Sequence, residues 1–142
     1  MFGEVIGQEE VQQRLMQMVS EDRLPHALMF CGPQGVGKLA LAVAFAKVLL
    51  TQTSNLKSQT SNQEVMLQKL EHPDLHFTYP TIKLPSMGSD HKPVSDDFAR
   101  EWRELLLQGG PYFSMDQWLQ AIGAENQQAI ITAGESDELV RK

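Results

Sequence analysis

The sequence predicts an α/β fold in which a strand, a glycine-rich loop and a helix together form a phosphate-binding site. Two features of the chain lead to this prediction. The segment Gly32–Lys38 reads Gly-Pro-Gln-Gly-Val-Gly-Lys, which has the glycine and lysine spacing of a phosphate-binding loop. The short apolar run Ala27–Cys31 precedes the loop, and the Ala- and Leu-rich run Leu39–Leu50 follows it. A composition of 42% apolar and 21% charged residues is that of an ordinary globular domain.

Each residue type in the loop has a chemical reason to be there. Glycines let several backbone N–H groups point at one phosphate, and the start of the next helix adds its unpaired N–H groups and its positive dipole end. Lys38 supplies a positive charge for the outer phosphates. Leu39 stands where the pattern has a hydroxyl that ligates Mg²⁺. We therefore expect a loop that holds phosphates but is poorly equipped for metal-assisted hydrolysis; a glycine-rich turn that merely carries a lysine is the plainer alternative.

Helical periodicity and polar composition predict the elements around the loop. Apolar residues recur at helical spacing over Glu9–Ser20, which predicts a helix there. The stretch Thr51–Gln63 is rich in Thr, Ser, Asn and Gln, so we expect an exposed loop or a disordered segment. A second strand is predicted over Leu75–Tyr79. Before it we expect a short helix, from about Glu64 to Leu70, anchored by Val65, Leu67 and Leu70.

Two further helices are predicted between residues 81 and 127, after a loop over 81–94. Ser95, followed by two acidic residues, is a good helix start, and this helix is expected to run to about Gln108. Ser114 and Gln117 form a capping box that opens the next helix, and Gly123 suits its C-terminus.

Most of the larger aromatic residues fall in this same segment, and two interpretations of them stay open. They either pack the two helices into a small satellite core or form a docking surface for a partner, where Trp and Tyr are favoured anchors. The residues concerned are Phe98, Trp102, Tyr112, Phe113 and Trp118.

Charge and cysteine content limit the classes of protein to consider. The net charge of −6 argues against this chain being the main nucleic-acid-binding surface, because that role is carried by Lys and Arg. Cys31 is the one cysteine, so no internal disulfide forms, and a cytoplasmic location is expected. We expect Cys31 to be buried in the first strand. No signal peptide or membrane-spanning run is evident in the sequence.

Several short motifs together resemble a known family. Their order is Val5-Ile6-Gly7-Gln8, then Arg23-Leu24-Pro25-His26-Ala27-Leu28, then the loop, then His72-Pro73-Asp74. This order resembles the bacterial clamp-loader ATPases of the AAA+ family and, more closely, the delta-prime subunits of DNA polymerase III. The resemblance covers residues 2–80, and residues 128–142 weakly resemble the segment before the acidic Walker B strand of the family.

The resemblance implies a fold, a domain organisation and a function. The fold would be an incomplete P-loop three-layer domain: residues 1–80 form its N-terminal part, 81–127 an inserted helical pair, and 128–142 the start of the return segment. The protein would assist ATP-dependent loading of a sliding clamp onto primed DNA, together with other clamp-loader subunits. The holoenzyme would be a DNA-directed DNA polymerase.

The resemblance also implies a nucleotide site for ATP or ADP. By match, Val5 and Ile6 would lie near the adenine. The phosphates would be held by the loop and the residue that follows it, namely Gly32, Pro33, Gln34, Gly35, Val36, Gly37, Lys38 and Leu39. We expect weak nucleotide binding that depends on Lys38, and weak or absent Mg²⁺ binding because of Leu39.

The sequence departs from the family in two places. Family members commonly carry a four-cysteine zinc module after the loop helix, whereas Thr51–Glu71 contains no cysteine, so no zinc is expected. His72 and His76 are not expected to share a helix face. No apolar run ending in Asp or Glu is found, so the Walker B strand is expected after residue 142 or not at all, and the sequence resembles an N-terminal fragment.

Three functional hypotheses follow: an active ATPase motor subunit, a clamp-loader subunit that acts as a scaffold without hydrolysing ATP, or a P-loop kinase of small metabolites. Leu39 and the missing acidic strand weigh against the first. The third would need an acceptor-binding pocket, and the N-terminal Val-Ile-Gly-Gln segment fits clamp loaders better.

The topology that the resemblance implies also predicts a problem of strand pairing. Both neighbours of the strand Ala27–Cys31 would come later in the family's sequence, so its backbone groups would be exposed on two edges. We therefore expect strands exchanged between copies of the chain, a rearranged pairing between Ala27–Cys31 and Leu75–Tyr79, or a fragment of a larger protein.

Overall fold

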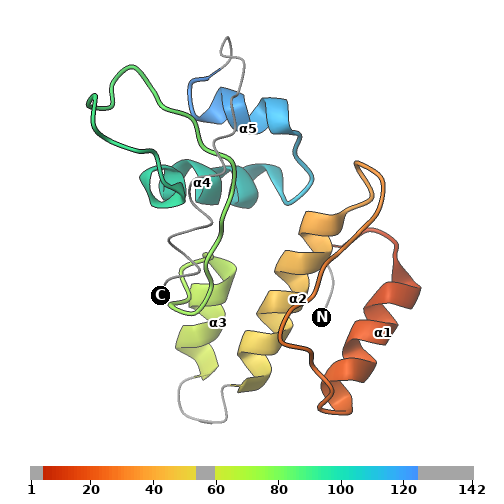
Figure 1. Cartoon of the computed structure of the whole chain (residues 1–142). Helices are drawn as coiled ribbons and strands as arrows, with labels where there is room; N and C mark the ends of the chain where they lie inside the picture. The colour runs from red at the N-terminus through yellow and green to blue at the C-terminus, as the bar shows by residue number, and fades with distance from the viewer. Residues whose placement is uncertain (1–4, 54–59, 125–142) are drawn as a thin grey trace. The chain divides into compact units, whose positions relative to one another are not determined.

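The computed structural model describes residues 5–53 and 60–124. The described residues divide into two compact units: the first holds those up to Leu75 together with Gly110–Tyr112, and the second holds His76–Gly109 and the described residues from Phe113 onward. Figure 1 shows the helices in chain order. They are α1 Glu9–Ser20, α2 Lys38–Thr53, α3 Thr60–Gln68, the 3₁₀ helix η1 Ser95–Phe98, α4 Ala99–Gly109 and α5 Met115–Ala121.

The first unit is built on α2, which packs against α1 on one side and α3 on the other (Figure 1). Leu15 of α1 is buried against Leu41 and Phe45 of α2. Half-buried apolar residues complete this core, namely Val5, Met18, Val19, Phe30 and Leu49. The helix predicted over Glu9–Ser20 is confirmed with the same bounds.

Helix α2 contains the Ala- and Leu-rich run Leu39–Leu50 and is apolar on most of its sides. Its buried residues are Ala40, Leu41, Val43, Ala44, Phe45 and Val48. The spacing of these residues leaves no broad polar face, so α2 lies inside the unit and not on its surface. The helix is longer than predicted and begins at Lys38, which places the lysine of the loop in the first helical turn.

The predicted loop Thr51–Gln63 is wrong at both of its ends. Helix α2 continues to Thr53 and α3 begins at Thr60, while residues 54–59 lie outside the described part of the chain. Thr51 remains helical because the buried turns before it hold the helix in place. Its hydroxyl donates to the carbonyl of Lys47 at 2.7 Å, a bond within the helix that does not itself stabilise it. In α3 the predicted anchor Val65 is instead 47% exposed, whereas Leu67 is buried, as is Leu70 just after the helix.

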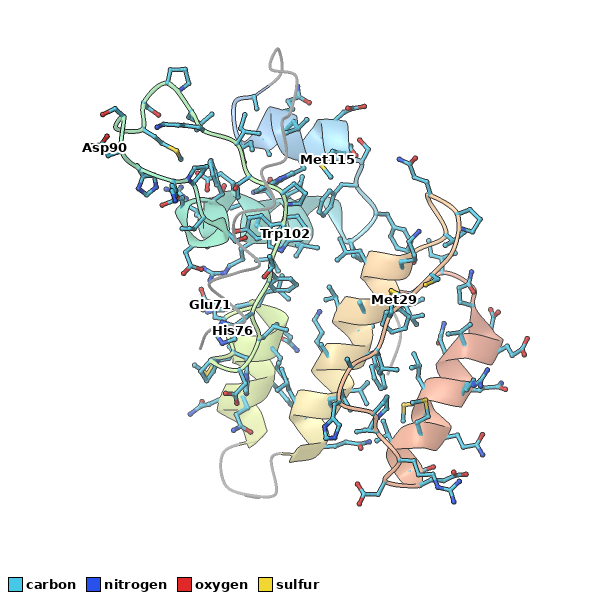
Figure 2. The ribbon with its side chains drawn as sticks, viewed as in Figure 1. Met29, Glu71, His76, Asp90, Trp102 and Met115 are labelled. Carbon is cyan, nitrogen blue, oxygen red and sulfur yellow. The ribbon has the colours of Figure 1, made fainter. Side chains whose placement is uncertain are left out.

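The two predicted strands are not formed, since no strand is assigned within residues 5–53 and 60–124. Figure 1 accordingly draws the stretches around residues 27–31 and 75–79 as plain traces. The rearranged pairing between these stretches is therefore wrong. A strand needs a hydrogen-bonding neighbour, and apolar composition by itself does not supply one. The predicted burial of Cys31 fails with it: Cys31 is exposed, and Met29 (labelled in Figure 2) is 85% exposed.

The second unit has a core of aromatic rings. Trp102 of α4 (labelled in Figure 2) stacks on Tyr79, with ring centroids 4.3 Å apart, and meets the edge of Trp118 of α5 at 5.1 Å. Phe113 packs edge-on against Trp102, and Phe98 against Trp118. Trp118 is 1% exposed. The satellite-core interpretation is thus confirmed for four of the five aromatic residues, and Tyr112 is the exception.

Both predicted helix starts of the second unit are confirmed, but only one of the two predicted caps is formed. Ser114 accepts a hydrogen bond from the Gln117 N–H at 3.2 Å, and the Gln117 side chain accepts from the Ser114 N–H at 2.8 Å, which is the predicted capping box. Gly123, with φ +75°, ends α5 as expected.

The helix predicted from Ser95 forms as η1 followed by α4, but Ser95 does not cap it. The Ser95 hydroxyl accepts from the Tyr79 N–H at 3.3 Å. The N-cap is Val94, whose N–H donates to the Asp97 carboxylate at 2.9 Å. The expected return segment 128–142 lies outside the described residues. Within the described residues, none of the helices is both long and apolar enough to cross a membrane.

Candidate nucleotide-binding site

The glycine loop contains two glycines in a backbone conformation that favours glycine. It leads directly into the first turn of α2 (Figure 1). Gly35 and Gly37 both have φ +84°, a region that residues with a side chain rarely adopt. The two positive φ values let the chain turn sharply just before Lys38, as a phosphate-binding loop requires.

The Lys38 side chain folds back over the loop. Its Nζ donates to the carbonyl oxygens of Gly32 at 2.8 Å and Pro33 at 2.7 Å. These two bonds use two of the three donors of the ammonium group. They hold the positive charge at the loop, beside the N-terminal turn of α2, where an anionic ligand would be stabilised.

Leu39 is the second residue of α2 and brings only hydrocarbon to the position of the missing hydroxyl. Among the described residues there is no group of three or more His, Cys, Asp or Glu side chains that could hold a metal ion. His72 is buried and its Nδ1 accepts from the Asp74 N–H at 3.2 Å, so this nitrogen already has a protein partner.

Tyr112 joins the N-terminal segment to the loop, a contact that the sequence analysis missed. Its hydroxyl oxygen accepts a hydrogen bond from the Ile6 N–H at 2.7 Å. A Cβ placed on Gly37 would lie 3.2 Å from Cε1 of Tyr112 and 3.6 Å from its hydroxyl oxygen. One phenol ring therefore lies against Ile6 and Gly37, two of the residues expected to contact nucleotide.

The remaining predicted site residues have different environments. Val5 is half-buried and packs on the core of the first unit, whereas the Ile6 side chain is 80% exposed. In the loop, Gly32 to Gly35 are exposed and Val36 to Leu39 are half-buried. The structure thus brings Ile6, Gly37 and Lys38 into one region, while Val5 packs against the core of the first unit.

Comparison with known proteins places this region within a family. The family model described as "DNA polymerase III, delta subunit" matches residues 7–104, which is more than half of the 142 residues and includes the whole loop. The matched residues extend past position 80, into the segment where the sequence analysis found no shared motif. No solved structure matches the chain.

Curated relatives share a short region of the chain. A replication factor C small subunit of Methanocella arvoryzae is 48% identical over 50 residues, which are 35% of this chain and 15% of that protein. A replication factor C small subunit of Methanosarcina mazei is 54% identical over 46 residues (32% and 13%). The DNA polymerase III subunit tau/gamma of Haemophilus influenzae is 44% identical over 48 residues (34% and 7%). The chain therefore spans only a small part of these relatives.

Proposed function

The chain belongs to the DNA polymerase III, delta subunit family, and we propose that it is a subunit of a clamp loader that assists the ATP-dependent loading of a sliding clamp during DNA replication. The observation that carries the proposal is the family match over residues 7–104. The glycine-rich loop inside this span, where Gly35 and Gly37 have positive φ, supports it. The relatives named above are subunits of replication factor C and of DNA polymerase III.

Membership of this family implies a P-loop α/β fold of the AAA+ type. The finer assignment is a delta-prime-like subunit. In this proposal residues 1–80 are the N-terminal part of an incomplete three-layer domain, 81–127 are an inserted helical pair, and 128–142 begin the return segment. The strand Ala27–Cys31 would then pair with strands beyond these segments, or with a second copy of the chain. Its exposed residues Leu28 and Met29 support this assignment, since pairing and sheet packing would cover them.

The site would bind ATP or ADP weakly and would not hydrolyse it by itself. Lys38 would contact the outer phosphates, the glycines would present backbone N–H groups, and Ile6 would lie near the adenine. Leu39 offers no oxygen to Mg²⁺, so metal binding would be weak or absent. A subunit of this kind acts as a scaffold, in agreement with the short hydrogen bonds that keep the Lys38 ammonium on its own loop.

The partners in this proposal are the other clamp-loader subunits and, through the assembly, the sliding clamp and primed DNA. A net charge of −6 suits a subunit that meets DNA through its neighbours and not directly. Zinc is not part of the proposal, because the segment Thr51–Glu71 has no cysteine. A cytoplasmic location follows from the proposed role.

A reconstituted loading reaction tests the proposal. The other clamp-loader subunits, the sliding clamp and primed DNA of the same organism are mixed with ATP, with or without the full chain. Clamp retained on circular primed DNA is then measured. We expect loading to fall at least tenfold when the chain is omitted and to return when it is added. Loading that is the same with and without the chain would contradict the proposed role.

A further inference from the structure

Three groups of the candidate nucleotide site are already in contact with other residues of the chain: the Lys38 ammonium, the Ile6 N–H and the surface of Gly37. The Lys38 ammonium bonds to two loop carbonyls, and the Ile6 N–H is bonded to the Tyr112 hydroxyl. The surface of Gly37, where an added Cβ would lie 3.2 Å from Cε1 of Tyr112, is in contact with the Tyr112 ring. The Tyr112 side chain contacts two of these three groups, Ile6 and Gly37, and lies 106 positions after Ile6 in the sequence.

The phenol offers the site what a nucleotide base would offer. It has a flat aromatic surface and an oxygen that accepts a hydrogen bond from a backbone N–H. A purine ring likewise combines a flat surface with ring nitrogens that accept from N–H donors. A base that bonded to the Ile6 N–H would need the place that the Tyr112 hydroxyl holds at 2.7 Å.

We propose that Tyr112 is a built-in occupant of the nucleotide site, which an incoming nucleotide must displace. The inference rests on the proposed nucleotide-binding function of the loop. It adds a residue that lowers the affinity of the site for nucleotide by competition. This competition acts in addition to the missing metal ligand at position 39, where the motif has a hydroxyl and this chain has Leu39.

The residues around Tyr112 allow it to leave. Its side chain is 42% exposed, so displacement uncovers little buried surface. Gly110, two residues earlier, has φ +71° and gives the backbone a point at which it can turn. The docked ring is held by one hydrogen bond between uncharged groups and by contact with a glycine, which together make a modest attachment.

Competition makes a quantitative prediction. When a site is free in only a fraction of molecules, the apparent affinity falls by that fraction. If the ring is docked in about nine molecules of ten, its removal raises the affinity for nucleotide roughly tenfold. A residue that instead supports the shape of the site would have the opposite effect, since its removal would weaken binding.

The test compares variants of the full chain in calorimetric titrations with ADP and with ATP. Tyr112→Ala removes the ring and is expected to bind about ten times more tightly than the unmodified chain. Tyr112→Phe removes only the hydroxyl and is expected to fall between the two. The matched control is Met115→Ala: Met115 is 43% exposed, close to Tyr112 in both exposure and sequence, and lies in the second unit. This control should leave the affinity unchanged.

A second measurement keeps the test informative if Tyr112→Ala folds poorly. In ¹⁵N-labelled unmodified chain, hydrogen exchange at the Ile6 amide should be slow and should become faster in Tyr112→Phe, which keeps the ring. Circular dichroism checks the helix content of each variant. Unchanged exchange at Ile6 in Tyr112→Phe would overturn the inference by itself.

The outcomes separate this inference from the proposed function. Tighter binding in Tyr112→Ala that is lost on adding Lys38→Ala supports both. Binding that depends on Lys38 but is equal or weaker in Tyr112→Ala overturns the occupant role and leaves the nucleotide site standing. No binding in any variant at millimolar nucleotide overturns the nucleotide site and, with it, the occupant role.

Discussion

At the scale of single residues, the loop shows how a local pattern specifies a local structure. The sharp turn before α2 depends on the two positive φ angles at Gly35 and Gly37 and on the position of Lys38 in the first helical turn. These features involve only neighbours in sequence, so the spacing of glycines and lysine predicted them. The contact between Tyr112 and Ile6 joins residues 106 positions apart, and no spacing rule reaches that far.

Replacing Gly37 with alanine should destabilise the first unit. A left-handed backbone costs a residue with a side chain about 1–2 kcal/mol, and the new Cβ would lie 3.2 Å from the Tyr112 ring. Urea unfolding followed by circular dichroism measures the change, because three of the helices that give the signal, α1, α2 and α3, lie in this unit. The control is Gly88→Ala, where a Cβ meets nothing within 4 Å. Equal stability of the two variants would contradict the conformation given for the loop.

Replacing Lys38 with alanine should abolish measurable binding of ATP and ADP by the full chain. The ammonium is the positive side chain that the structure holds at the loop, through its bonds to Gly32 and Pro33. Calorimetry measures the effect. Lys69→Ala, which removes the same charge from an exposed position after α3, is the control and should bind as the unmodified chain does. Retained affinity in Lys38→Ala would remove the phosphate role from the loop.

At the scale of elements, helices were predicted well and strands were not. The periodicity of Glu9–Ser20 and the capping pair Ser114 and Gln117 carry their own hydrogen-bonding pattern, so each could be located from sequence. Strands need partners from elsewhere, and neither Ala27–Cys31 nor Leu75–Tyr79 has a strand partner within the described residues. The polar stretch after Leu50 was misjudged at its ends, because the anchored helix α2 extends into it.

The start of η1 gives a prediction about pH. A hydrogen bond from the Val94 backbone N–H lowers the pKa of Asp97 below its usual value, and the bond to His91 at 2.7 Å lowers this pKa further. A group whose pKa is lowered by folding stabilises the fold above its unfolded pKa, and this contribution is lost as the pH falls. Asp97→Asn should therefore destabilise the second unit at pH 7 and much less at pH 3.

Tryptophan fluorescence during urea unfolding measures this effect, because both tryptophans, Trp102 and Trp118, lie in the second unit. The control Asp96→Asn removes the same charge one position earlier and leaves the contacts of Val94 and His91 in place. An equal loss of stability at both pH values in Asp97→Asn would show that its carboxylate does not stabilise the helix start as a charged group.

At the scale of the whole molecule, each of the two units has a core of its own kind. The first is mainly aliphatic, with Phe45 packed beside Leu15 and Leu41, and the second is aromatic around Trp102 and Trp118. Regular apolar spacing predicted the helices of the first core, whereas for the aromatic cluster the sequence left a satellite core and a docking surface both open. The return of Gly110–Tyr112 to the first unit was not predicted, since these residues lie between two helices of the second.

The most direct test of the account asks whether the full chain joins a clamp loader. The chain and the other clamp-loader subunits of the same organism are mixed at micromolar concentration, and the masses of the complexes are measured by sedimentation velocity and native mass spectrometry. The account predicts one complex that contains the chain at a fixed stoichiometry. Subunits that assemble with one another while the chain sediments separately would contradict it.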